Sequence, residues 1–151
     1  MRVVIGSDHA GYEQKEHLKA HLWSWGYEVT DVGTDSADES VDYPDLALEV
    51  GHAVGDGTAD FGVLVCGTGI GMAIAANKVN GVRAASITDP EFARLARQHN
   101  DANVLTVSGR FVPAGTNELI VKTFLETPFE GGRHGTRVDK ITAAEDDRCD
   151  S

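Results

Sequence analysis

Short runs of Val and Ile alternate along the chain with longer stretches in which apolar residues recur at helical spacing. Most of the short runs are apolar at consecutive positions, as in strands of a parallel sheet that is covered on both faces. The alternation predicts an α/β fold with helices on both sides of a five-stranded, mainly parallel sheet. The strands are expected at residues 2–6, 28–32, 61–66, 83–87 and 104–108.

The stretches between the strands predict helices, and two of them carry clear end signals. Leu18 and Leu22 share one face of the first helix, and Gly26 follows it as a residue suited to a helix C-terminus. Asp89 precedes Pro90, which is the pattern of an N-cap acid before a first-turn proline. The helices are expected at residues 13–25, 44–54, 71–78, 90–99, 116–125 and 137–146.

The last expected helix follows the glycine-rich turn at residues 130–132 and has no strand after it, so we expect it to extend to a partner subunit. Residues 34–42 are polar enough to form a mobile loop, and the acidic residues 146–151 are expected to be a frayed tail. The chain has 151 residues, of which 41% are hydrophobic, and it contains no long linker. A single domain over residues 1–151 is therefore expected.

Charge and cysteine content limit the binding partners and the cellular compartment to be expected. Thirteen Lys and Arg against 24 Asp and Glu give a net charge of −11, which disfavours nucleic acid, although a few arginines in one cleft could still bind a small anion. Cys66 and Cys149 lie in dissimilar surroundings and do not suggest a disulfide framework. We see no signal-peptide pattern, and no apolar segment approaches the roughly 20 residues that span a bilayer. The expectation is a cytoplasmic protein that does not bind membranes.

Ligands of open parallel sheets bind beyond the carboxyl ends of the strands. Three loops there hold reactive side chains, at residues 6–11, 66–71 and 108–110. The loop at 66–71 does not fit three familiar phosphate-binding loops. Met72 stands where a dinucleotide fingerprint needs glycine and where a cysteine phosphatase needs arginine, and the Gly-Lys-Ser/Thr of a Walker loop is absent.

The same loop offers a thiol, a hydroxyl and backbone N–H groups around one small concavity. Moving a proton between adjacent carbons of a hydroxy-carbonyl sugar needs a base near the carbon and donors that stabilise an enediolate oxygen. Cys66 precedes a predicted helix N-terminus, where thiols ionise more readily, and Thr68 could be a donor. A buried cysteine is also common as a small apolar core residue, so the loop alone leaves both interpretations open.

Other polar residues each have a structural alternative. Asp8-His9 could supply an acid or base and a phosphate donor, or a helix cap beside a surface histidine. His99-Asn100 ends a helix and could move a proton at a ring oxygen, or only cap that helix. Arg133 and Arg137 form a basic cluster with His134 that suits phosphate, although solvated arginines are common.

His17 and His21 are four residues apart and could share a metal ion. No glutamate follows His17, so the zinc-protease motif is absent, and a solvated helix face is the expected outcome. No other cluster has a convincing metal-ligand spacing, and the sequence therefore predicts no metal site.

Six segments share a known order and spacing: Gly6-Ser7-Asp8-His9-Ala10-Gly11, Asp42-Tyr43-Pro44, Cys66-Gly67-Thr68-Gly69-Ile70-Gly71, Ala75-Ala76-Asn77-Lys78, Arg97-Gln98-His99-Asn100 and Gly131-Gly132-Arg133-His134. Together they resemble ribose-5-phosphate isomerase type B, a family that includes galactose-6-phosphate isomerase subunits and isomerases of other sugar phosphates. The resemblance covers essentially the whole chain apart from the acidic tail.

This resemblance implies a Rossmann-like three-layer α/β/α sandwich that assembles as a homodimer or tetramer, with active sites shared between subunits and with no metal or nucleotide cofactor. It implies an aldose–ketose isomerase that interconverts ribose 5-phosphate and ribulose 5-phosphate. The nearest alternative is the same chemistry on a tetrose or hexose phosphate. An alternative of another class is a binding module that has lost turnover, and the intact candidate residues argue against it.

The resemblance also implies roles for individual residues. The catalytic residues would be Cys66 as the base between C1 and C2, Thr68 as a donor to the enediolate, and His99, helped by Asp8, at ring opening. The substrate-binding residues would be Asp8, His9, Arg110, Arg133 and Arg137 around the phosphate and sugar, Gly67, Thr68, Gly69, Ile70 and Gly71 at the enediolate, and Asn100 and Tyr43 at the sugar. Some relatives use a carboxylate base instead, so Cys66 assigns the chain to the cysteine-containing branch and favours the catalytic interpretation of this residue.

Overall fold

The computed structural model describes the backbone of residues 1–149 and the side chains of residues 1–147. Five strands form one parallel sheet in the order β2-β1-β3-β5-β4. Each strand end lies within one residue of its predicted position, because the apolar runs stop where polar or small residues begin. The strands are β1 (Arg2–Ser7), β2 (Glu28–Asp31), β3 (Phe61–Cys66), β4 (Ala84–Ser86) and β5 (Val104–Ser108).

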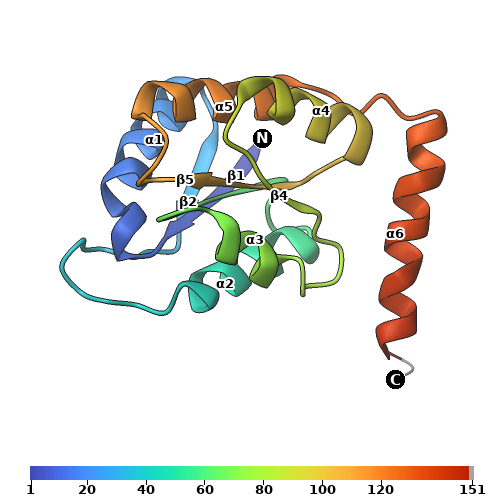
Figure 1. The fold of residues 1–151 in the computed structure, drawn as a ribbon, viewed down its shortest axis with the longest axis horizontal. Coiled ribbons are helices and arrows are strands. Elements are labelled where there is room, and N and C mark those ends of the chain that lie inside the picture. Colours follow the sequence, from blue (N-terminus) through green and yellow to red (C-terminus); the bar gives the residue numbers. More distant parts are fainter. Residues whose placement is uncertain (150–151) are drawn as a thin grey trace.

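Helices cover both faces of the sheet, which confirms the predicted three-layer arrangement (Figure 1). The helices α1 (Tyr12–Ser24), α4 (Pro90–Asn100) and α5 (Ala114–Glu126) pack on one face, and α2 (Tyr43–Gly55) and α3 (Ile70–Ala76) pack on the other. A short 3-10 helix, η1 (His9–Gly11), leads from β1 into α1. No helix within residues 1–149 is both long enough and apolar enough to span a membrane.

Side chains of the strands alternate between two hydrophobic cores. In β1, Val3 and Ile5 point to the core under α1, α4 and α5, whereas Val4 points to the core under α2 and α3. Leu18 and Leu22 of α1 are fully buried in the first core, as their spacing predicts. Burial on both faces explains why the strands are apolar at consecutive positions.

The helix end signals act as predicted. Asp89 caps α4 by accepting a hydrogen bond from the Glu91 N–H at 2.8 Å, and Pro90 is the first residue of the helix. Gly26 follows α1 with a φ of 91°, a left-handed conformation that glycine adopts readily. Residues 32–42 connect β2 to α2 without regular secondary structure, in agreement with the predicted loop.

The last helix, α6 (Arg133–Cys149), stands clear of the layers beside the edge strand β4 (Figure 1). It begins four residues before its predicted start, directly after Gly131 and Gly132, which both have positive φ. Far along α6, a Glu145 Oε1 accepts the N–H of Gly81 at 2.8 Å, so the helix also touches the loop before β4. The helix reaches Cys149, and residues 150 and 151 of the predicted frayed tail lie outside the described residues.

Candidate active site

The strand order reverses direction between β1 and β3, because β2 lies on one side of β1 while β3, β5 and β4 follow on the other. A crevice at the carboxyl ends of the strands is expected at such a point. The loop after β1 brings Asp8 and His9 there, and the loop after β3 brings Cys66 and its glycine-rich neighbours. The sheet topology therefore brings two of the predicted loops side by side.

Hydrogen bonds from the end of β5 hold the loop that follows Cys66. The Gly109 N–H donates to the Cys66 carbonyl at 2.8 Å, and the Arg110 N–H donates to the Gly67 carbonyl at 3.2 Å. In a trans peptide, the next N–H points opposite to the carbonyl. The N–H groups of Gly67 and Thr68 therefore point away from β5, where they can act as donors to an oxyanion.

The Cys66 thiol is buried, with 6% of the residue exposed, and its Sγ accepts the N–H of Gly69 at 3.0 Å. The Gly69 N–H is therefore placed as a donor to the sulfur, and the thiolate is the form of cysteine that acts as a nucleophile or base. Gly69 has a φ of 85°, and the Thr106 hydroxyl donates to its carbonyl at 2.7 Å. Thr68 is exposed, and its Oγ1 accepts the N–H of Ile70 at 3.2 Å.

Asp8 and His9 are fixed by backbone contacts. A carboxylate oxygen of Asp8 accepts the N–H of Gly11 at 3.0 Å. Asp8 therefore caps the short helix η1, which is the structural role that the sequence also allows for it. The N–H of Val41 donates to His9 Nδ1 at 3.4 Å. With Nδ1 accepting this N–H, Nε2 is the ring nitrogen that can act as a donor. His9 can therefore donate a hydrogen bond to an anion.

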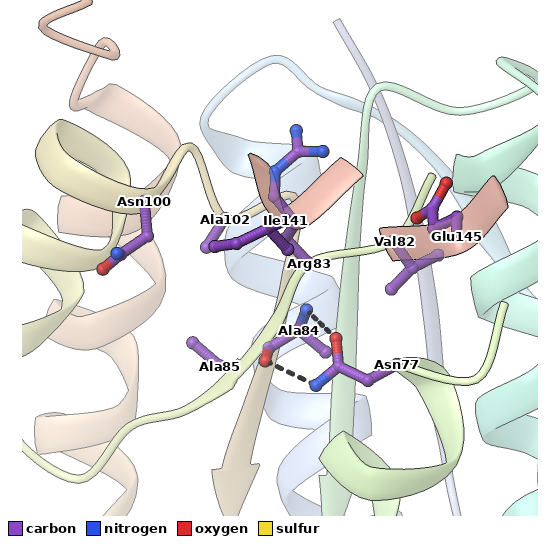
Figure 2. Close-up of a pocket in the computed structure, with 9 residues that line it drawn as sticks. All are labelled: Asn77, Val82, Arg83, Ala84, Ala85, Asn100, Ala102, Ile141 and Glu145. Atoms are coloured by element: carbon purple, nitrogen blue, oxygen red, sulfur yellow. Dashed lines mark hydrogen bonds between the residues drawn. The ribbon is translucent and has the colours of Figure 1, made fainter. Parts of the chain in front are cut away.

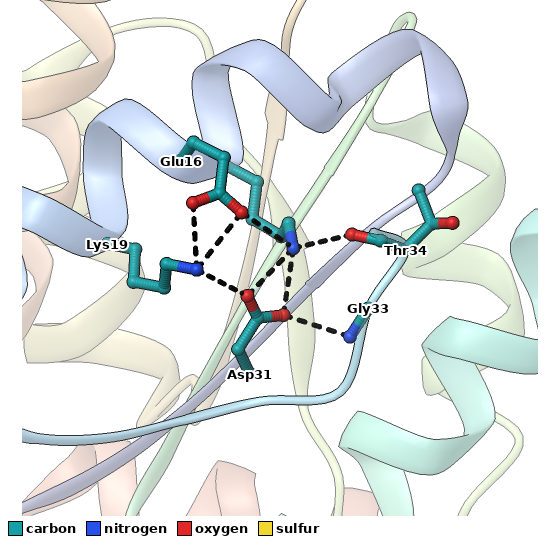
Figure 3. Close-up of polar contacts among 6 residues, drawn as sticks. Glu16, Lys19, Asp31, Gly33 and Thr34 are labelled. Atoms are coloured by element: carbon teal, nitrogen blue, oxygen red, sulfur yellow. Dashed lines mark hydrogen bonds and ion pairs between the residues drawn. The ribbon is translucent and has the colours of Figure 1, made fainter. Parts of the chain in front are cut away.

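A buried ionic network holds the segment that packs beside Asp8 (Figure 3). Lys15 is fully buried, and its Nζ donates to both carboxylate oxygens of Asp31 at 2.8 Å and to the Thr34 carbonyl at 2.7 Å. Gly33 and Thr34 in turn exchange backbone hydrogen bonds with Ser7, at 2.8 and 2.9 Å. The network therefore connects α1 and β2 to the residue that precedes Asp8.

Tyr43 and Arg110 complete this edge of the site. The Tyr43 ring packs on Gly71, where an added Cβ would lie 2.5 Å from Tyr43 Cε1, so a side chain at Gly71 would displace the ring. The Arg110 guanidinium lies beside Gly67, 3.6 Å from the position of an added Cβ. The predicted site residues that the structure brings to this edge are Asp8, His9, Tyr43, Cys66, Gly67, Thr68, Gly69, Ile70, Gly71 and Arg110.

His99 and Asn100 lie at the amino ends of the strands, opposite the carboxyl ends that hold Cys66. These two sides are called the His99 edge and the Cys66 edge. They end α4, which runs back from the carboxyl end of β4 to the amino end of β5 at Val104. Cys66 pairs with Ser108 at the other end of β5. Four residues of strand separate these two ends, which is about 13 Å. His99 and Asn100 therefore lie apart from Cys66 within one chain.

A third histidine, which is not among the predicted site residues, lies against His99. The His134 ring at the start of α6 stacks on the His99 ring, with centroids 4.3 Å apart. Burial lowers the pKa of His134, and the charges of His99, Arg133 and Arg137 lower it further, while Glu130 opposes them. Arg133 and Arg137 are exposed, and they share this edge with His99 rather than the Cys66 edge. The signal in the sequence that could have identified His134 is its position between two basic residues, Arg133 and Arg137.

A pocket of about 490 Å³ lies between α6 and the edge strand β4, next to Asn100 (Figure 2). Ile141 and Glu145 of α6 line one side of it. On the other side, the Asn77 side-chain amide pairs with Ala84 of β4, donating to its carbonyl at 3.0 Å and accepting its N–H at 2.7 Å. The pocket belongs to the His99 edge and is remote from Cys66.

Comparisons with known proteins agree with this arrangement. Residues 3–141 match the model of the Ribose/Galactose Isomerase family. The chain is 46% identical over 147 residues to ribose-5-phosphate isomerase B of Escherichia coli (strain K12), covering 97% of this chain and 98% of the relative. It is 40% identical over 141 residues to the D-erythrulose-4-phosphate isomerase of Pectobacterium atrosepticum, covering 93% of each.

A solved structure shows the same fold with a ligand. The crystal structure of ribose-5-phosphate isomerase B from Mycoplasma genitalium with bound ribulose-5-phosphate is 45% identical to this chain, with a TM-score of 0.93 and 96% of both chains covered. The fold, the loops at the strand ends and these matches define an aldose–ketose isomerase. The chain belongs to the Ribose/Galactose Isomerase family.

Proposed function

We propose that this enzyme interconverts D-ribose 5-phosphate and D-ribulose 5-phosphate, in the cytoplasm and without a cofactor. The observation that carries the proposal is the loop from Cys66 to Gly71, whose buried thiol and outward N–H groups lie beside Asp8 and His9 at the strand-order reversal. The similarity to a structure with bound ribulose-5-phosphate supports the pentose phosphate as substrate.

In this proposal, Cys66 moves the proton between the two carbons. As the thiolate, it removes the proton from C2 of the open-chain aldose, the electrons of that C–H bond form the C1=C2 bond, and the carbonyl oxygen becomes an oxyanion. The N–H groups of Gly67 to Gly71 and the Thr68 hydroxyl stabilise this enediolate. Return of the proton to C1, with transfer of the hydroxyl proton from O2 to O1, gives the ketose.

Ring opening and phosphate binding require the other edge of the sheet. His99 moves the proton at the ring oxygen, with Asp8 assisting, and Arg133 and Arg137 bind the phosphate together with Arg110 and His9. Asn100 and Tyr43 contact the sugar. Since the two groups of residues lie at opposite edges of one chain, the proposal requires a homodimer in which α6 and the end of α4 of one subunit complete the site of the other.

Exposed apolar residues support this assembly. Ile70 and Ile74 on α3 are 58% and 60% exposed next to the Cys66 loop, and Ile141 on α6 is 53% exposed beside the pocket at the other edge. Contact between these two surfaces in a dimer would remove apolar area from water and bring the two groups of site residues together.

A tetrose phosphate is the second candidate substrate, because one similar relative is a D-erythrulose-4-phosphate isomerase. A coupled assay without added metal should compare kcat/KM for ribose 5-phosphate, erythrose 4-phosphate, allose 6-phosphate and galactose 6-phosphate. A lead of more than about tenfold for ribose 5-phosphate, a preference of roughly 1.4 kcal/mol at the transition state, supports the pentose assignment. A lead for another sugar would replace the substrate and leave the chemistry unchanged.

The variant Cys66→Ala tests the proposed base. Turnover should fall by about 10³-fold or more, while binding of the sugar phosphate changes less than about threefold, because the thiol acts on the carbon and leaves the phosphate contacts intact. Cys149→Ala makes the same chemical change at the other cysteine and should keep wild-type turnover. Wild-type turnover in Cys66→Ala would exclude this residue as the base.

A further inference from the structure

Two histidines of α1 converge on one glutamate of α5, on the outer side of the helical layer. His17 Nε2 lies 3.5 Å from Glu118 Oε2, and His21 Nε2 contacts Glu118 Oε1. The possible metal-ligand atoms of these three residues all lie within 4.8 Å of one another. The sequence predicts a solvated helix face here, and the structure instead brings the histidines together with a carboxylate from another helix.

One separation in this group already suits a small divalent ion. Zinc binds histidine nitrogen and carboxylate oxygen at about 2.0 to 2.2 Å, so the ligand atoms of a tetrahedral site lie about 3.3 Å apart. The separation of 3.5 Å between His17 Nε2 and Glu118 Oε2 is already close to that value. Rotation of the three side chains would bring all three ligand atoms to the ion, and water could supply the fourth ligand.

Rigid elements present these ligands. His17 and His21 are one turn apart on a regular helix, and the His21 ring packs against Trp25 with centroids 5.6 Å apart. The two helices are also joined one turn away, where the Asn117 side-chain N–H donates to Gln14 Oε1 at 2.6 Å. Ligands held on packed helices lose little freedom when an ion binds.

We propose that His17, His21 and Glu118 form a binding site for a divalent transition-metal ion of the zinc type, which clips α1 to α5. A single surface ion pair needs only one histidine, whereas here both oxygens of one carboxylate face imidazole nitrogens. The site lies outside the proposed substrate site, so its occupation adds stability and is not required for turnover.

Zinc titration by calorimetry tests the site in the full chain after treatment with EDTA. Wild-type protein should bind one equivalent of zinc more than each of His17→Gln, His21→Gln and Glu118→Gln. The test compares this difference and not the total stoichiometry, because His99, Glu130 and His134 form a second group with suitable spacing. That group stays intact in these variants. His52→Gln removes an exposed histidine of α2 and should keep the wild-type stoichiometry.

Nickel quenching of tryptophan fluorescence reports the location. In a Trp23→Phe background the remaining tryptophan is Trp25, whose ring lies beside His21. Nickel should quench its fluorescence at a concentration at least about tenfold lower than in the same protein with His17→Gln. Zinc at about 100 times its Kd should raise Tm by about 5 °C more in wild type than in His17→Gln.

Equal zinc stoichiometry and affinity in wild type and the three variants would overturn the proposal, as would equal quenching with and without His17. If wild-type protein takes up no zinc at about 100 μM free ion, the proposal is also overturned, and the three residues form an ordinary surface ion pair. The three side chains are partly exposed, so the variants should keep the wild-type circular dichroism spectrum, and a lost equivalent of zinc then reports the ligands themselves.

Discussion

Separation of the proposed catalytic groups on opposite edges of the sheet makes a quantitative prediction for mixed dimers. Cys66→Ala removes the proposed base, and His99→Asn removes the proposed ring-opening group from the other edge. If each site takes Cys66 from one subunit and His99 from its partner, neither homodimer of the variants has a complete site. A mixed dimer has one site that lacks both groups and one site that is complete.

The size of the effect follows from counting subunits. When the two variants are coexpressed in equal amounts and pair at random, half of the dimers are mixed. Each mixed dimer has one complete site of two, so the mixture should reach about one quarter of wild-type activity per subunit. If both groups came from the same chain, all sites in the mixture would lack one of them, and activity would stay at the level of the single variants.

A reciprocal pairing serves as the control. Wild type coexpressed with the double variant Cys66→Ala/His99→Asn gives mixed dimers in which both shared sites are incomplete. Activity should then be about one quarter of wild type, contributed by wild-type homodimers, whereas same-chain sites would give about one half. The assay is ribose 5-phosphate turnover on material whose subunit composition is measured by native mass spectrometry. No activity in the first pairing together with one half in the second would refute the shared site.

Two predictions concern the scaffold of the site. Burial alone would raise the pKa of Asp31, but hydrogen bonds from Lys15, Lys19 and the Gly33 N–H outweigh it and hold this pKa below its ordinary value of 3.8. Asp31→Asn leaves Lys15 buried with weaker partners and should cost about 3 kcal/mol in urea unfolding at pH 7. The difference should shrink as the pH falls below about 4, where the carboxylate of the unfolded wild-type chain takes up a proton while the folded one, with its lower pKa, stays ionised, and a difference that persists undiminished at pH 3 would contradict this account. Gly11→Ala would put a Cβ 2.5 Å from the Val65 carbonyl oxygen and should cost about 2 kcal/mol or more, whereas the control Gly115→Ala meets only an ordinary contact at 3.9 Å and should not destabilise.

Local signals in the sequence predict most of the fold. The strands follow from their apolar runs, and α1 and α4 begin or end where Gly26 and Asp89 indicate. The pattern is less informative where burial and hydrophobicity disagree. Phe92 of α4 is 60% exposed, while the buried face of that helix uses Ala93 and the aliphatic part and guanidinium of Arg97.

The helix α6 and the α1–α5 surface mark what local patterns leave open. Residues 133–136 have no apolar periodicity, so the sequence predicts a later start for α6, and contact with α4 rather than amphipathicity stabilises its first turn. His134 and Glu118 gain their partners from helices distant in the sequence. Proximity of this kind depends on how helices pack across the sheet, which spacing along the chain does not contain.

The side-chain amide of Asn77 hydrogen-bonds the outward-facing N–H and C=O of Ala84, the first residue of β4. In a parallel strand, the N–H and C=O of one residue point to the same side, so this amide takes the position that a residue of a sixth strand would fill. An uncapped edge strand offers a template for another chain and is a common start of aggregation. With these groups of Ala84 occupied by a side chain of the same molecule, the start of this edge is closed to backbone pairing with the sheet of a neighbouring molecule.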